Sequence, residues 1–322
     1  MRIIRSIKRR LQYLKGRNLR LDRKAIPIPD NVLEENRGHR IVRFDRNSTE
    51  FWVWIKKCDL QEFQRYSYPH KKALEFFFST QLLEIKNEDI VLDAAGGKSD
   101  YLITVNNFVH PSKLILQDHI YPVRMPRLSS EDGIKSKFYS EEGINAPFEH
   151  SNGVYNNTKE KNGILTIGGD VTEILLPEKS VDKISCHHAF EHFQENKDYL
   201  FVKEVSRLLK IGGKAVIIPL FISTSHIESW NTKKAEQFDK DAQLLIDETA
   251  SLPGGDTDGH FARIYSPEAL RIRILDRLNE LGLAWTIVDC TLDGKNIPDM
   301  SLNVGAKINC PLRALVLTKN AK

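Results

Sequence analysis

The sequence predicts an α/β protein built on a mostly parallel, doubly wound sheet. Five short apolar runs alternate with helical or loop-forming stretches, and this alternation favours crossover connections between parallel strands. The 322 residues are 41% hydrophobic and 28% charged, which is enough apolar material for a substantial core. This composition excludes wholesale disorder, a collagen-like chain and a disulfide-stabilised miniprotein.

The five runs are expected to be the central strands, and they lie at residues 90–92, 114–116, 164–167, 181–186 and 214–219. Two later strand-like runs lie at 285–288 and 313–317. Helical spacing predicts helices at about 70–84 and 198–209. A further helix is expected to start at Pro267, with Ser266 as its N-cap, and to end at Gly282. Its apolar stripe runs to Leu281.

Breaks in the pattern divide the chain into three parts. Residues 1–30 form a basic arm that Pro27 and Pro29 separate from the rest, and residues 31–87 form an accessory segment with an aromatic cluster. Residues 88–322 form the α/β domain. Within it, residues 119–162 are polar and rich in Gly, Asn and Ser, and we expect this inserted segment to cover the substrate.

The net charge of +4 comes from the basic arm alone. Residues 1–24 contain ten Lys or Arg and one acid, whereas the remaining chain contains 37 basic and 42 acidic residues. The slightly acidic body lacks the basic face that phosphate neutralisation needs, so we expect no nucleic-acid partner. Ile3, Ile7, Leu11 and Leu14 form one helical stripe, which predicts peripheral membrane contact through residues 1–24; a docked terminal helix and a disordered tail are the alternatives.

The cysteines indicate a reducing compartment. Cys58, Cys186, Cys290 and Cys310 are widely scattered and lack the spacing of a zinc or redox motif, so we expect reduced thiols and no metal. No apolar run approaches the ~20 residues of a membrane span, and the first residues do not resemble a signal peptide. We expect a cytoplasmic protein, located at the inner face of the membrane if the arm binds lipid.

Residues suited to ligand binding follow the predicted strands. In an open parallel sheet, ligands bind outside the carboxyl ends of the strands. The first strand is followed by Asp93, Ala95, Gly96 and Gly97, whose small side chains let the backbone approach a ligand. A carboxylate such as Asp118, after the second strand, can accept both hydroxyls of a ribose.

The third strand leads into Gly169-Asp170-Val171, and the fourth leads into the run from Cys186 to Phe193. With the turn Leu208-Leu209-Lys210-Ile211-Gly212-Gly213 before the fifth strand, residues 88–220 resemble the class I S-adenosylmethionine-dependent methyltransferases of the type-11 kind.

The resemblance implies a seven-stranded Rossmann-like sheet whose last strand is antiparallel, with S-adenosylmethionine as cofactor. It implies that residues 93–97 wrap the amino-acid part of the cofactor and that Asp118 binds its ribose. Asp170, with Val171 beside it, would contact the adenine, and His187 or His188 would line the sulfonium pocket.

The acceptor side is less defined by the sequence. A hydroxyl acceptor benefits from a general base, for which His187, His188 and His260 are the candidates. Residues 256–260, together with Arg263, resemble an Asp, His and Arg element of related enzymes, so Asp258, Arg263 and Tyr265 are expected to face the acceptor.

We therefore expect O-methylation of a small molecule or of a sugar in a surface glycan, and the sequence does not indicate an oligomeric state. The family's three loop glycines correspond here to Ala95, Gly97 and Ser99, of which one is glycine. This departure keeps an alternative open: a non-catalytic methyltransferase-like module in a biosynthetic complex.

Overall fold

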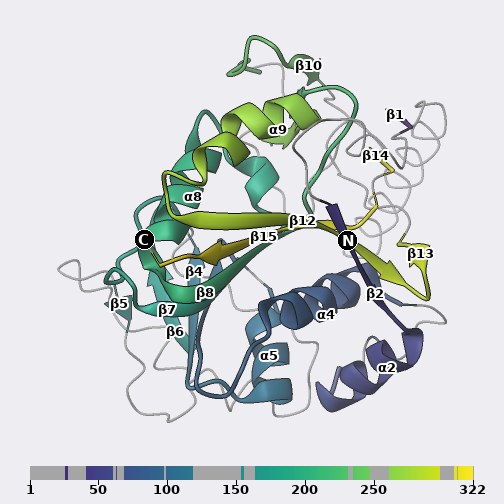
Figure 1. The fold of residues 1–322 in the computed structure, drawn as a ribbon, viewed down its shortest axis with the longest axis vertical. Coiled ribbons are helices and arrows are strands. Elements are labelled where there is room, and N and C mark those ends of the chain that lie inside the picture. The colour runs from purple at the N-terminus through teal and green to yellow at the C-terminus, as the bar shows by residue number, and fades with distance from the viewer. Residues whose placement is uncertain are drawn as a thin grey trace, which may run out of the picture.

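The computed structural model describes residues 41–60, 63, 69–97, 99–118, 164–230, 235–246, 261–297 and 311–321, and the backbone of 26–27, 154–155 and 308–309. Within these residues, a central sheet of ten strands has helices on both faces (Figure 1). The arm over residues 1–24, most of the inserted segment 119–162, Asp258 and His260 lie outside the described residues.

Five parallel strands form the centre of the sheet in the order β8-β7-β3-β4-β6. They are β3 (Ile90–Ala94), β4 (Lys113–Asp118), β6 (Ile164–Gly168), β7 (Val181–His187) and β8 (Leu209–Ile218). The chain winds outward from β3 in one direction and then returns to add β7 and β8 on the other side. This confirms the predicted doubly wound sheet and puts its switch point between β3 and β7.

The two C-terminal strands complete the sheet as the resemblance implied. Strand β15 (Arg313–Lys319) lies between β8 and β12 (Leu283–Leu292) and is antiparallel to both. Strand β2 (Ile41–Arg46) adds in parallel to β12. Two short strands, β13 (Lys295–Asn296) and β5 (Val154–Tyr155), pair with β12 and β6.

Two small sheets were not anticipated. One contains β9 (Ile227–Trp230), β10 (Gln243–Ile246) and β11 (Phe261–Ile264), and the other pairs β1 (Ile26–Pro27) with β14 (Ile308–Asn309).

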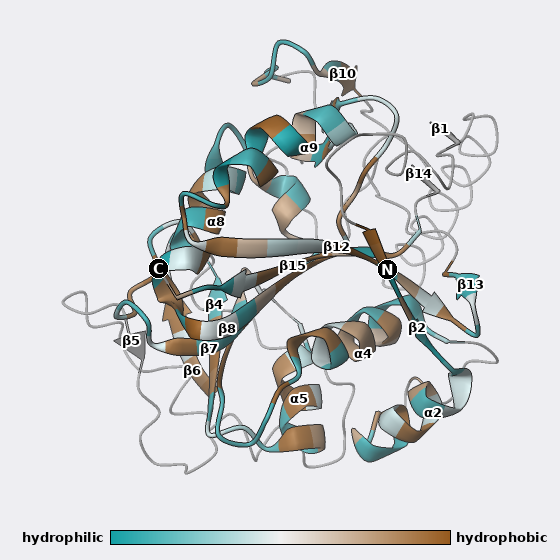
Figure 2. Cartoon of the chain, in the orientation of Figure 1, coloured by the Kyte–Doolittle hydropathy of each residue, from teal (hydrophilic) through white to brown (hydrophobic). Residues whose placement is uncertain are grey.

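The helices divide between the two faces of the sheet (Figure 1). Helices α2 (Ser48–Lys57), α4 (Lys71–Leu83) and α5 (Tyr101–Val109) cover one face, and α8 (Lys197–Leu208) and α9 (Pro267–Arg273) cover the other. Successive side chains of β3 point to opposite faces of the sheet. Val91 therefore packs in the core beneath the first group of helices, and Leu92 packs in the core beneath the second. Figure 2 shows hydrophobic residues on the central strands and on α4 and α5.

The predicted helix positions hold, with shifts at their ends. Ser266 is the N-cap of α9 and accepts a hydrogen bond from the amide of Ala269. This helix stops at Arg273 and continues as the 3-10 turn η2 (Leu275–Arg277), although Ile274 and Leu278 are buried as the stripe predicts. Strand β8 begins at Leu209, earlier than predicted, and runs through the Gly-Gly pair.

The accessory segment contributes to the same core as the α/β domain. The aromatic rings of Phe51, Trp54 and Phe77 pack against one another where α2 meets α4. No helix in the described part of the chain combines the length and the apolar character needed to cross a bilayer.

Candidate functional site

The candidate site lies at the carboxyl ends of β7, β3, β4 and β6. These four strands are neighbours in the sheet, so the residues that follow them are brought together from distant parts of the sequence. The loop after β3 therefore lies between His187, at the end of β7, and Asp118, at the end of β4. The structure thus brings together most of the residues that the sequence predicted for the cofactor.

The loop after β3 is built for close approach of its backbone. Ala95 and Gly97 have φ angles of +52° and +55°, so the chain turns twice through the left-handed region. Between them, a Cβ atom on Gly96 would lie 2.5 Å from both Asp93 Oδ2 and Leu116 Cδ1. Position 96 consequently tolerates glycine alone without movement of its neighbours.

Gln117, which the sequence reasoning missed, connects three of the strand ends. Its buried Oε1 accepts a hydrogen bond from the amide of Ala95 at 3.0 Å, and its Nε2 donates to the carbonyl of Gly169 at 2.7 Å. The Gly169 amide in turn donates to the Asp118 carbonyl at 3.0 Å. A buried amide in an otherwise apolar strand was the available signal, because such a group needs hydrogen-bond partners.

Asp93 and His187 form a buried polar pair at the switch point. Asp93 Oδ1 accepts a hydrogen bond from Ser185 Oγ at 2.8 Å and lies 3.3 Å from Nδ1 of His187. The His187 ring lies against Phe76 and Tyr101, with ring centroids 5.4 and 4.3 Å away. Asp93 Oδ2 and His187 Nε2 are buried without a hydrogen-bond partner.

These features fit the cofactor that the resemblance implies. Unsatisfied buried polar atoms are rare in native proteins, and a ligand that hydrogen-bonds them removes the cost. The crowded Gly96 and the buried carboxylate of Asp118, whose Oδ2 is 3.4 Å from the position of a Cβ on Gly97, add a narrow cradle beside that pair.

Asp170 has a different environment from the other acids of the site. Its side chain is half exposed and accepts hydrogen bonds from Lys197 Nζ at 2.7 Å and from the amide and hydroxyl of Thr172. Partial burial raises its pKa, but Lys197 and Thr172 outweigh this and bring the pKa to about 2. Val171, next in the chain, is buried in the core.

His188, the residue after β7, is held between two carboxylates. Its Nε2 lies 2.7 Å from Glu75 Oε1, and its Nδ1 lies 3.4 Å from Glu191 Oε1. Burial lowers the pKa of this imidazole, but the two carboxylates more than compensate and raise it to about 9. At neutral pH His188 is therefore a cation.

Two residues predicted to face the acceptor are instead engaged inside the protein. Arg263 is fully buried and forms ion pairs with Asp198 and Glu228, and the hydroxyl of Tyr265 donates to Asp198 at 2.8 Å. These contacts explain both residues by packing alone and lend no support to an acceptor role.

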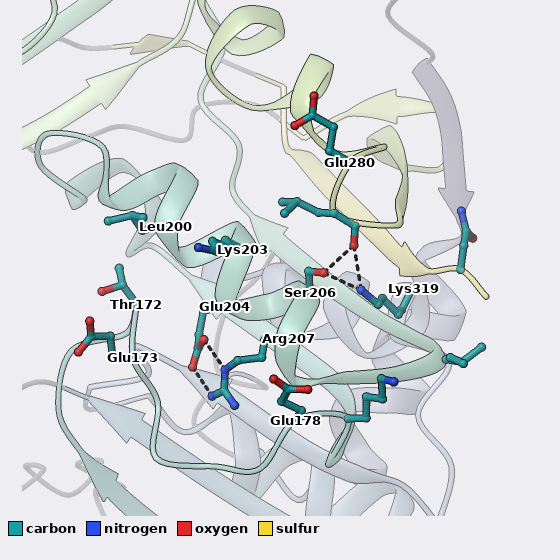
Figure 3. A pocket seen from close by; sticks show the side chains of 14 residues that line it. Thr172, Glu173, Glu178, Leu200, Lys203, Glu204, Ser206, Arg207, Glu280 and Lys319 are labelled. Atoms are coloured by element: carbon teal, nitrogen blue, oxygen red, sulfur yellow. Dashed lines mark hydrogen bonds and ion pairs between the residues drawn. The ribbon is translucent and has the colours of Figure 1, made fainter. Parts of the chain in front are cut away.

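Away from the predicted site, a pocket of about 660 Å³ opens along α8 (Figure 3). Its walls also include Glu178 before β7 and Lys319 at the end of β15, and it contains none of the predicted site residues. An ion pair between Glu204 and Arg207 lies within it. In the described residues, no group of three or more His, Cys, Asp or Glu side chains is arranged to hold a metal ion.

Comparison with known proteins identifies the class. Residues 148–217 match the family described as a methyltransferase domain, of the type-11 kind. The match includes Gly169, Asp170, His187 and His188, whereas the loop after β3 precedes it. It confirms the predicted resemblance to the S-adenosylmethionine-dependent methyltransferases, and with it an enzyme that uses this cofactor.

Several solved methyltransferase structures are similar to this chain. One from Mesorhizobium loti has 13% identity and a TM-score of 0.45, covering 76% of this chain and 98% of its own. One from Methanosarcina mazei has 12% identity and a TM-score of 0.41, covering 74% and 95%. The 1,6-didemethyltoxoflavin-N1-methyltransferase of Burkholderia thailandensis, which holds S-adenosylhomocysteine, has 10% identity and a TM-score of 0.44, covering 89% and 98%. No curated protein matches the sequence.

Proposed function

We propose that this protein transfers the methyl group of S-adenosylmethionine to a hydroxyl of a small molecule or of a sugar in a surface glycan. The observation that carries the proposal is the buried pair Asp93–His187, which keeps two unpartnered polar atoms beside the cramped loop after β3. Cofactor binding at this edge would supply a partner for Asp93 Oδ2, and the acceptor hydroxyl would supply one for His187 Nε2.

The cofactor-binding residues divide by strand. The loop from Asp93 through Ala95 and Gly96 to Gly97 is proposed to hold the amino-acid part of the cofactor, and Asp118 is proposed to accept the ribose hydroxyls. Asp170 and Val171 are proposed to lie beside the adenine. Since the Asp170 carboxylate already holds Lys197 and Thr172, we propose that it acts by shaping this loop and not as a free acceptor.

His187 is proposed as the general base. In the tautomer that donates from Nδ1 to Asp93, the buried Nε2 is a free acceptor, and Asp93 fixes the orientation of the ring. When bound, S-adenosylmethionine supplies the methyl group and retains the electron pair of the carbon–sulfur bond. Nε2 of His187 would accept the hydroxyl proton of the acceptor when the methyl group is transferred.

His188 cannot take that proton at neutral pH, because its imidazole is already protonated. We propose that it presents its positive charge to the acceptor. Asp258 and His260 remain proposals for the acceptor side, since both lie outside the described residues.

Isothermal titration with S-adenosylmethionine tests the cofactor site. We expect wild type to bind, and we expect Asp118→Asn to bind at least about tenfold more weakly, because a charge-assisted hydrogen bond contributes ~1.5–3 kcal/mol. Gly96→Ala should also bind more weakly, since its Cβ meets Asp93. Glu268→Gln, on the exposed surface of α9, is the matched control and should bind as wild type does. Absence of binding to folded wild type would refute the proposal.

The non-catalytic module remains the second candidate function. It is favoured by one observation: Ala95 keeps a left-handed backbone where the family has glycine, as expected if the loop were no longer selected for its ligand. The two candidates differ in transfer of a labelled methyl group from S-adenosylmethionine to cell-extract acceptors. An enzyme gives labelled product that Asp118→Asn reduces, whereas the module gives none.

The basic arm is proposed to bring the enzyme to an anionic membrane surface, which would suit a glycan acceptor. Flotation on anionic liposomes of the full chain and of a version lacking residues 1–24 tests this. We expect the shortened chain to lose lipid binding; equal flotation would remove the arm from the proposal.

A further inference from the structure

Helix α4, which lies outside the region matched to the methyltransferase family, provides part of the candidate site. Phe76 packs on the ring of His187, and the hydroxyl of Ser79 contacts that of Tyr101 at 3.3 Å. Glu75, from the same helix, contacts His188.

Glu75 is an unusual residue for its position. Most of the middle of α4 is apolar and buried, and the Glu75 side chain is only 1% exposed. An unpaired carboxylate at such a position is strongly destabilising, whereas an apolar residue would fill the same space without that penalty. Packing alone therefore does not explain the carboxylate.

The contacts of His188 determine where its protons are. An ionised carboxylate only accepts hydrogen bonds, so the ring nitrogen 2.7 Å from Glu75 Oε1 must carry a proton. The other ring nitrogen faces Glu191, whose side chain is 3% exposed. Other groups around the pair include Lys72, whose Nζ lies 3.1 Å from Glu75 Oε2, the ring of Phe221, and His192, whose Nε2 lies 3.7 Å from Glu191 Oε1.

The backbone at His188 is also constrained. Its φ angle is +49°, a left-handed conformation that is strained for a residue with a side chain. The His188 amide donates to the carbonyl of Ile218 at 3.2 Å, and the ring is held by the hydrogen bond from Nε2 to Glu75. Strained backbone held by its surroundings is typical of functional positions.

We propose that Glu75 is a positioning residue that keeps His188 as a fixed imidazolium, whose partly exposed ring presents its positive charge to the methyl acceptor. The proposal rests on the proposed function for the acceptor, but the Glu75–His188 contact can be tested without any ligand. The His188 side chain is 27% exposed, so part of the ring is free to meet an acceptor. In this role the residue orients the acceptor oxygen and leaves proton uptake to His187.

The test is a titration of the histidine side chains by NMR, with His188 assigned by its absence from the spectrum of His188→Gln. In wild type we expect a His188 midpoint near 9, the pKa that its contacts predict. In Glu75→Gln the midpoint should fall by roughly one pH unit or more, because the nearest opposite charge is lost. Glu84→Gln, an exposed acid at the end of the same helix that pairs with Lys214, is the control and should leave the midpoint unchanged.

A second variant should shift the His188 midpoint in the opposite direction, and it keeps the proposal testable if Glu75→Gln does not fold. Lys72 is partly exposed, and its charge opposes protonation of His188. Lys72→Met should therefore raise the midpoint. A wild-type midpoint near 6.5, or a Lys72→Met midpoint that does not rise, would overturn the proposal.

Cofactor titrations separate this proposal from the proposed function. We expect Glu75→Gln to bind S-adenosylmethionine within about twofold of wild type, because Glu75 contacts His188 on the acceptor side. If wild type fails to bind while the His188 midpoints behave as described, the methyltransferase proposal fails and the Glu75–His188 pair stands. If Glu75→Gln loses cofactor affinity as Asp118→Asn does, Glu75 belongs to the cofactor site and its role as acceptor-side positioning residue is refuted.

Discussion

Ala95 has a strained backbone conformation in the loop after β3. It occupies a left-handed turn that a glycine would adopt without strain, between a crowded glycine and the buried Asp93. Gln117, which lies outside the loop, holds the Ala95 amide in this conformation through a hydrogen bond.

Ala95→Gly should stabilise the protein. Relief of the left-handed conformation gains about 1–2 kcal/mol, and the greater freedom of glycine in the unfolded chain returns ~0.4–1 kcal/mol. We expect a net gain on the order of 0.5–1 kcal/mol in the free energy of unfolding, measured by urea denaturation. A loss of stability would show that the methyl group packs usefully.

The residues predicted for the cofactor lie at or just after the carboxyl ends of the central strands. Asp93, Gly96, Asp118 and Gly169 could be predicted because parallel strands present their carboxyl ends at one edge. Glu75 could not, because it lies in a helix 113 residues before His188 and its charge has a partner only after folding.

At the scale of elements, the buried Asp198 joins α8, β11 and α9. It accepts hydrogen bonds from Arg263, from Arg273 and from the hydroxyl of Tyr265. Arg263 and Tyr265, at the end of the predicted acceptor element, thus attach the small sheet to the domain.

Asp198→Asn should be strongly destabilising. The change removes the charge that two arginines share and leaves Arg263 with less compensation in a fully buried site, a loss of about 3 kcal/mol. Chemical denaturation measures it against Asp276→Asn, which removes a surface partner of Arg271 and should cost less than about 0.5 kcal/mol. Similar values for the two variants would contradict the assigned role of Asp198.

The elements themselves were predictable to different degrees. The seven main strands and helices α4, α8 and α9 follow from runs and spacings within about ten residues of sequence. The sheet of β9, β10 and β11 was missed because its four-residue strands are defined by pairings with distant segments, and local patterns carry little of that information. Strand β2 was missed for the same reason: its partner β12 lies more than 230 residues away.

At the scale of the whole molecule, the Glu75–His188 pair should make stability depend on pH. The pKa of His188 rises from its ordinary 6.5 to about 9 on folding, so its contribution is complete below pH 6.5 and is lost as pH rises through 9. Although burial raises the pKa of Glu75, Lys72 and His188 lower it from 4.5 to about 2, so its contribution is complete above pH 4.5 and is lost on acidification.

The pair should therefore stabilise the protein most between about pH 4.5 and 6.5. We expect the free energy of unfolding of wild type to fall between pH 6 and pH 9.5 by on the order of 2 kcal/mol, followed by urea denaturation at each pH. In Glu75→Gln this alkaline fall should shrink, because His188 no longer gains its partner. An equal fall in both proteins would assign the pH dependence to other groups.

The position of β15 has a consequence for how the chain is made. This strand is the last of the sheet in sequence, yet it lies between β8 and β12, and β2 attaches beyond them. During synthesis, β2 emerges from the ribosome long before its partner β12. One edge of β8 likewise stays unpaired until β15 emerges. Unpaired edges recruit strands from other chains. We therefore expect the nascent chain to be prone to aggregation until β15 emerges, and chaperone binding during translation should shorten that period.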